Sequence, residues 1–236
     1  MLQVHPYKLT NTFIEEAKRL VGTKVLIGSV KGIVKTDARV TGVKVNGDVL
    51  PADVVVIAMG PWTHNACDWL KIPPINGGRA HSVVLRPGHN DITAHCLFTE
   101  YVGREVRGEP ELYPRPDGTV YACGFSDRER LPASAAEVKV NAESCQRLAT
   151  LCGRMSQSLD GAEVVAQQAC YLPTPTRGHL PVIGRVPETE NAYVAAGHTC
   201  WGILNAPATG KAMAELIVDG SCSFIDLSPF DPKNNV

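Results

Sequence analysis

The sequence predicts an α/β protein. Along the chain, two segments of an open sheet flank a segment that forms an antiparallel sheet. Residues 54–59 form a continuous, mostly β-branched run that is typical of a strand buried on both faces. Between residue 73 and about residue 130, turns rich in glycine and proline separate short strands, as in antiparallel sheets. Residues 192–196 then form another apolar strand before a turn and a helix.

Composition excludes several classes of protein. The chain has 236 residues, of which 44% are hydrophobic and 20% charged, which excludes disorder, collagen and coiled coil and allows one domain or two small ones. The net charge of −1 gives no electrostatic reason to expect nucleic acid or membrane binding. No apolar run approaches the roughly 20 residues of a membrane helix, and no export signal is visible, so a soluble chain is expected.

The cysteines and histidines do not predict a metal centre. The eight cysteines are scattered without a CxxC pair, and the seven histidines lie far apart. Free thiols, no metal and a cytoplasmic location as the default are therefore expected.

Turn and cap signals predict the first elements. Thr12 and Glu15 form a capping box before an apolar helical stripe, and Gly22 is placed to end that helix. Residues 25–27 predict a short strand, and Asn46-Gly47 predicts a hairpin.

The second half of the chain carries similar signals. Asp117-Gly118 predicts another turn, and residues 135–155 have the spacing of one or two helices. A final helix is expected over residues 206–218, capped by Asn205 and ended by Gly220.

Two turns of small residues follow predicted buried strands, at residues 58–62 and 196–202. Ligands of open α/β sheets lie beyond the carboxyl ends of strands, and glycine allows close approach of the backbone. The second turn leads into a helix N-terminus, which favours a phosphate, a carboxylate or an electron-rich heterocycle. Either turn taken alone is better explained as a tight connection.

Other catalytic signals are few. GxSxG, HExxH and GxxxxGK[ST] motifs do not occur in the sequence. Tyr113-Pro114-Arg115, just before a turn, presents an aromatic ring and a guanidinium to a pocket or simply forms a hairpin.

Taken in order, several segments resemble the D-amino-acid-oxidase-like family of FAD-dependent oxidoreductases, particularly its glycine oxidase and sarcosine oxidase members. The longest and most specific similarity is the carboxy-terminal glycine-rich block. The segments that carry the resemblance are residues 4–6, 13–21 and 25–27, the run 52–62, the hairpin 112–118 with Gly124, and residues 181–184 and 197–210.

The resemblance implies an incomplete Rossmann-like FAD-binding domain with an inserted antiparallel-sheet substrate domain. The implied boundaries are residues 1–72 and 169–236 for the FAD-binding domain and residues 73–168 for the substrate domain. The implied cofactor is FAD, and the implied reaction is oxidation of a C–N bond in a small amine or amino-acid-like substrate.

The resemblance also implies site residues, although no residue is assigned as a catalytic acid or base. The substrate-binding residues implied are Tyr113, Arg115 and Trp201. The cofactor-binding residues implied are Val30, Ala58, Gly60, Trp62, Gly197, His198, Gly202, Ile203 and Leu204.

The sequence departs from the family pattern in two respects. The strand–GxGxxG–helix unit that grips the FAD pyrophosphate is missing, so an amino-truncated chain is expected. The positions of two substrate-clamping arginines read Leu172-Pro173 and Cys200-Trp201, so an ordinary amino acid bound through both contacts is not expected.

Two alternatives remain open. Cys170 matches the position at which sarcosine oxidases tether flavin, or is a small buried strand residue. The chain as a whole is an oxidoreductase, or it is a non-catalytic remnant or one half of a split flavoprotein that pairs with an amino-terminal flavin-domain partner.

Overall fold

A computed structural model describes residues 4–88, 92–103 and 107–235. These residues form two units. Unit 1 comprises residues 78–171, and unit 2 comprises residues 4–77 and 172–235. Assignment of the units as substrate and flavin domains stays a prediction.

The main sheet of unit 2 has the order β12 (Val182–Arg185), β13 (Ala192–Ala196) and β4 (Val55–Ile57). Strands β13 and β4 are parallel, with Val194 opposite Ile57, and β12 is antiparallel to β13. One face of this sheet packs into an apolar core with Val40, Leu70 and Ile75. The parallel pair fixes which strand ends share an edge, and this decides where the candidate site lies.

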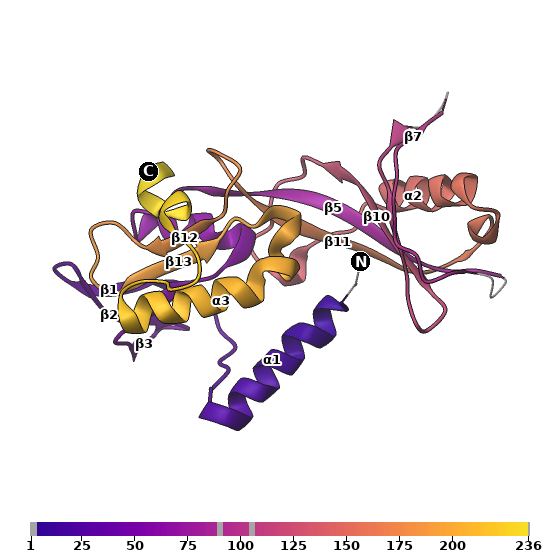
Figure 1. The fold of residues 1–236 in the computed structure, drawn as a ribbon. Helices are drawn as coiled ribbons and strands as arrows, with labels where there is room; N and C mark the ends of the chain where they lie inside the picture. The colour runs from indigo at the N-terminus through magenta and orange to yellow at the C-terminus, as the bar shows by residue number, and fades with distance from the viewer. Residues whose placement is uncertain (1–3, 89–91, 104–106, 236) are drawn as a thin grey trace. The chain divides into compact units, whose positions relative to one another are not determined.

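Helix α3 (Gly202–Asp219) covers the other face at β12 and β13, where Met213 packs with Ile183 and Tyr193 (Figure 1). At β4 the same face is open, and Val54 and Val56 are 41% and 42% exposed. The prediction of a strand buried on both faces is therefore wrong for β4. The reason is that β4 ends the sheet and α3 packs on the other two strands.

A three-stranded antiparallel meander precedes β4 and consists of β1 (Val30–Thr36), β2 (Arg39–Val45) and β3 (Asp48–Pro51). The predicted Asn46-Gly47 hairpin is confirmed, with both residues in the left-handed region. The buried amide of Asn191 joins the meander to the sheet, because Nδ2 donates to the carbonyls of Val40 and Asp53 at 2.7 and 2.6 Å.

Helix α1 spans Pro6–Val21 and starts seven residues earlier than the capping box predicts, so Thr12 lies inside the helix. Proline in the first turn explains this start. The predicted stop is confirmed, since Gly22 has φ of +68°. None of the residues of α1 is buried. The strand predicted at residues 25–27 is wrong: the segment is an exposed loop, and Ile27 is 91% exposed.

In the sheet of unit 1, β10 is antiparallel to β5 and to β9, and β9 is antiparallel to β6, as the turn spacing predicts. Asp117-Gly118 joins β9 to β10. Two strands, β5 and β11, contain the boundaries between the units. The order of the sheet is β11 (Glu163–Pro175), β5 (Ile75–Arg86), β10 (Val120–Asp127), β9 (Glu111–Pro114) and β6 (Leu97–Phe98), and a small hairpin pairs β7 (Tyr101–Val102) with β8 (Arg107–Gly108).

Helix α2 (Ala142–Met155) packs on one face of this sheet and buries Leu148 against Leu112 and Ala122 (Figure 1). The helical spacing of residues 135–155 thus resolves into α2 and a short 3-10 turn at Ala135–Glu137. Asn141 caps α2, because its side chain accepts a hydrogen bond from the Ser144 amide.

A partly buried ion pair lies in unit 1. Arg79 donates from Nε and Nη2 to the two carboxylate oxygens of Asp127 at 2.8 and 2.7 Å, and from Nη1 to the Lys139 carbonyl at 3.0 Å. The Arg79 contact lowers the pKa of Asp127 to about 2.

Candidate functional site

The first predicted turn directly follows β4. Gly60 has φ of +53° and begins a 3-10 helix, η1 (Gly60–Asp68), in which the Trp62 amide donates to the Met59 carbonyl at 3.0 Å. Ala58 is exposed, whereas the Trp62 side chain is half-buried. The left-handed glycine therefore turns the chain sharply away from the end of the strand, as predicted.

The second turn follows β13, and residues 197–204 are called the glycine corner below. Gly197 has φ of +83°, and a Cβ atom there would lie 2.9 Å from Cγ of Pro175 and 3.2 Å from Cδ1 of Ile75. Both the conformation and the lack of space require glycine. Thr199 is also left-handed, with φ of +53°, so two such residues shape the corner.

Helix α3 begins at Gly202 and not at residue 206, so the predicted cap by Asn205 is wrong. The prediction placed Pro207 in the first turn, whereas the structure holds it inside the helix. Proline has no N–H to donate to the carbonyl of Ile203. The amides of Gly202, Ile203 and Leu204, the first three residues of α3, have no acceptor within the helix, and no side chain caps it. These amides form a donor cluster with partial positive charge.

His198 holds the corner against α3. Its Nε2 lies 3.0 Å from the hydroxyl of Thr209, which is inside the helix. Burial lowers the pKa of His198 below its ordinary value of 6.5, which favours the neutral imidazole at pH 7.

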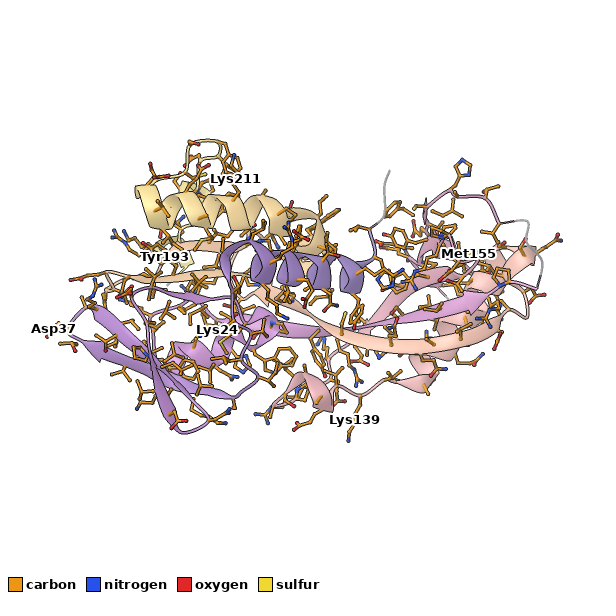
Figure 2. The ribbon with its side chains drawn as sticks, turned by 90° about the horizontal axis from the view of Figure 1, so that it is seen from below. Lys24, Asp37, Lys139, Met155, Tyr193 and Lys211 are labelled. Carbon is orange, nitrogen blue, oxygen red and sulfur yellow. The ribbon has the colours of Figure 1, made fainter. Side chains whose placement is uncertain are left out.

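The two turns lie at the same edge of the sheet of unit 2. Because β13 and β4 are parallel and Val194 is opposite Ile57, their carboxyl ends meet there. Figure 2 shows the side chains of this unit, with Tyr193 labelled on β13 and Lys211 on α3, the elements before and after the corner. The structure thus brings Ala58 and Gly60 near the corner. The corner also exposes apolar side chains: Trp201, Ile203 and Leu204 are 59%, 36% and 66% exposed.

Val30 lies apart from both turns along the chain. It begins β1 in the meander, where it pairs with Val45 and is 37% exposed. A role for Val30 in cofactor binding stays a prediction.

Tyr113 and Arg115 belong to unit 1. The Tyr113 hydroxyl donates to Oε2 of Glu111 at 2.5 Å, and burial together with this bond raises the pKa of Tyr113. The Arg115 guanidinium lies 4.9 Å from the centre of the Tyr121 ring. Glu111 was not predicted as a site residue, although its position two residues before Tyr113 puts both side chains on one face of a strand.

Cys170 lies in strand β11 but is exposed, so its interpretation as a buried strand residue is wrong. None of the eight cysteines forms a disulfide bond. Across residues 4–88, 92–103 and 107–235, no group of three or more His, Cys, Asp and Glu side chains is placed to hold a metal ion. No helix in the same ranges is long and apolar enough to cross a bilayer.

A family model described as FAD dependent oxidoreductase matches residues 2–216. The chain belongs to this family. It is 33% identical to TDA3 of Saccharomyces cerevisiae, whose name classes it as an oxidoreductase, over 98% of this chain and 50% of the relative. It is also 26% identical to glycine oxidase of Pseudomonas putida, over 88% of this chain and 53% of that enzyme. The resemblance on which the sequence analysis rests is therefore confirmed, and the family's cofactor is FAD.

Solved structures share the fold. The L-proline dehydrogenase structure from P. horikoshii superposes with a TM-score of 0.76 at 23% identity, over 96% of this chain and 59% of that one. Glycine oxidase from Bacillus cereus gives a TM-score of 0.76 at 22% identity, over 92% and 57%. The mixed α/β fold class is thus confirmed. The chain spans 50% of the length of TDA3 and 64% of the length of a similar Schizosaccharomyces pombe protein whose name classes it as an oxidoreductase.

Proposed function

We propose that this chain forms part of an FAD-dependent oxidoreductase that oxidises a C–N bond of a small amine or amino-acid-like molecule. The observation that carries the proposal is the meeting of two glycine turns and the uncapped start of α3 at one sheet edge, in a chain of this family. Relatives named glycine oxidase and 4-methylaminobutanoate oxidase support the C–N bond as the target.

The corner fits the ring system of FAD. Uncapped amides at the start of α3 suit an electron-rich edge, and the exposed side chains of Trp201, Ile203 and Leu204 suit an apolar ring. Gly202, whose Cβ position is in ordinary contact with His198 at 3.7 Å, allows the ring to approach the backbone closely. The sequence holds no GxGxxG loop for the diphosphate, so the fit concerns the ring alone. FAD, when bound, supplies the two-electron oxidation.

The chain's own residues would bind the cofactor and the substrate and orient them. The amides of Gly202 and Ile203 would stabilise negative charge at the ring edge nearest α3. Ala58, Gly60 and Trp62 would border the ring from the turn after β4. The substrate-binding roles of Trp201 in unit 2 and of Tyr113 and Arg115 in unit 1 stay predictions.

Reconstitution tests this proposal. Purified protein is incubated with excess FAD, passed through a desalting column and examined for flavin absorbance. Bound flavin that bleaches under anaerobic conditions when an amine is added supports the oxidoreductase, whereas a colourless protein contradicts FAD binding by this chain alone.

A matched pair of variants locates the binding site. Leu204→Asp adds a carboxylate at the exposed start of α3, where it favours the helix but repels an electron-rich ring edge. Val218→Asp adds the same charge at the other, equally open end of α3. FAD uptake that falls at least tenfold for L204D and less than twofold for V218D supports the corner, and equal uptake by both contradicts it.

The second candidate is a split or non-catalytic flavoprotein, and the open edge of β4 favours it. Val56 is exposed on strand β4, which ends its sheet, Val54 is exposed just before that strand, and α1 has no buried residue. A partner chain that adds a strand beside β4 would cover these valines and bring a phosphate-binding loop. Under this candidate, FAD is taken up only when such a partner is co-expressed, and Val56→Lys prevents the pairing.

A further inference from the structure

One face of the unit 1 sheet gathers an unusual set of side chains. Cross-strand partners share a face, and Tyr113 is paired with Tyr121, while Glu111 is paired with both Cys123 and Phe98. Helix α2 packs on the opposite face, which Leu112 and Ala122 form. The name tyrosine face is used here for Phe98, Glu111, Tyr113, Tyr121 and Cys123.

One carboxylate oxygen of Glu111 accepts hydrogen bonds from neighbouring side chains, and the other is available to a ligand. Oε2 accepts from the Tyr113 hydroxyl at 2.5 Å and from the Cys123 thiol at 3.6 Å. Among the described residues, no hydrogen bond reaches Oε1 and no cation lies within ion-pair distance of the group. The Tyr113 oxygen also keeps lone pairs after donating its proton. Two acceptors, one of them charged, therefore point to a donor with more than one N–H.

The aromatic rings add to the preference for a cation. Phe98 meets Tyr113 edge to face at 5.8 Å, and Tyr113 lies 6.1 Å from Tyr121. Ring faces carry negative partial charge and attract cations. Arg115 already occupies the face of Tyr121, at 4.9 Å. Tyr121 is paired with Tyr113, two residues or about 7 Å along the strand from Glu111, so the Arg115 guanidinium and the Glu111 carboxylate belong to different cross-strand pairs.

We propose that Glu111, with Tyr113 and Phe98, binds an alkylammonium group, so that the molecule taken by this protein is a cationic amine. This inference rests on the proposed function and names its substrate class.

An NMR titration of the purified full chain tests this. The probe is butylammonium chloride, with butanol as the neutral control and pentanoate as the anionic one, and the tyrosine ring signals are assigned with Tyr113→Phe and Tyr121→Phe. Butylammonium is expected to shift the Tyr113 signals saturably, at least tenfold more tightly than butanol or pentanoate. Glu111→Gln keeps the shape and removes the charge, and is expected to weaken binding at least tenfold.

Two further variants make the result decisive. Glu163→Gln removes the same charge from an exposed carboxylate of β11 that pairs with Arg86, and is expected to change binding less than twofold. Phe98→Ala removes a half-exposed ring and is expected to weaken binding about threefold. Equal binding by wild type and E111Q, or tighter binding of pentanoate, would overturn the proposal. The titration requires no flavin, so its failure is distinct from a failure to take up FAD.

Discussion

The imidazole Nε2 of His198 lies 3.0 Å from the Thr209 hydroxyl, and this contact joins the turn after β13 to the interior of α3. Both groups are partly buried. A polar pair in this position keeps the uncapped start of α3 in a fixed relation to the sheet edge, because losing one partner leaves the other without a hydrogen bond.

Thr209→Val tests this contact. The substitution keeps the shape and removes the hydroxyl, so the free energy of unfolding is expected to fall by about 1 kcal/mol. Thr93→Val is the matched control, because Thr93 makes the same kind of contact to His95 at 3.0 Å in an exposed position. The control should change stability by less than about 0.5 kcal/mol in urea denaturation. Equal effects of the two variants would show that the His198 contact has no special role.

Gly197→Ala is expected to destabilise unit 2 by roughly 1–3 kcal/mol, because the left-handed backbone and the nearby Pro175 ring both oppose a Cβ atom. Gly210→Ala, inside α3 with open space around its Cβ position, is expected to stabilise by up to about 1 kcal/mol. Thermal unfolding of the two variants compares them directly. An unchanged melting temperature in G197A would show that the corner accommodates a Cβ atom without loss of stability.

Acid is expected to weaken unit 1 through Asp127. Its folded pKa of about 2 lies below the ordinary value of 3.8, so the unfolded chain takes up this proton first as pH falls. The stabilisation, about 2 kcal/mol, is complete above pH 4 and disappears between about pH 4 and pH 2.

Asp127→Ala should remove this acid dependence and cost about 3 kcal/mol at pH 7, because the Arg79 side chain is only 9% exposed. Glu188→Gln, in the exposed pair with Lys71, should cost less than about 0.5 kcal/mol. Urea denaturation at a series of pH values measures both. An unchanged acid slope in D127A would assign the dependence to another group.

Trp201→Ala tests the exposed indole of the corner. Because the residue is 59% exposed, the melting temperature should move by only a few degrees. Affinity for FAD or for the amine substrate should fall at least fivefold if the ring borders them, as fluorescence titration would report. Tyr7→Ala, 74% exposed on α1, should leave these affinities unchanged. Unchanged affinities in W201A would remove Trp201 from the proposed site.

Local turn chemistry explains which elements the sequence predicted correctly. Asn46-Gly47, Gly22 and Gly220 are all left-handed, and each ends or turns an element at the predicted place. Such positions depend on the conformational freedom of one or two residues, so a short segment contains the whole reason. The Gly197 turn was predictable for the same cause.

The wrong predictions depend on neighbours distant in sequence. Residues 25–27 and Val56 are apolar enough for buried strands, but burial is decided by what packs on them. The start of α3 was misplaced because Pro207 signals a first turn, whereas the structure accepts it inside the helix. That Glu111 lies opposite Cys123 depends on the register between β9 and β10, which the sequence did not predict.

Strand β4 lies at the end of its sheet, with Val56 exposed within it and Val54 exposed just before it. This exposure affects how the protein behaves in concentrated solution. Its outer edge gives an extended peptide a ready row of hydrogen-bonding groups, so concentrated samples should slowly self-associate through it. Val54→Lys is expected to oppose this self-association, because a charged side chain beside the edge strand disfavours pairing. Light scattering during storage would show slower growth of particles in this variant.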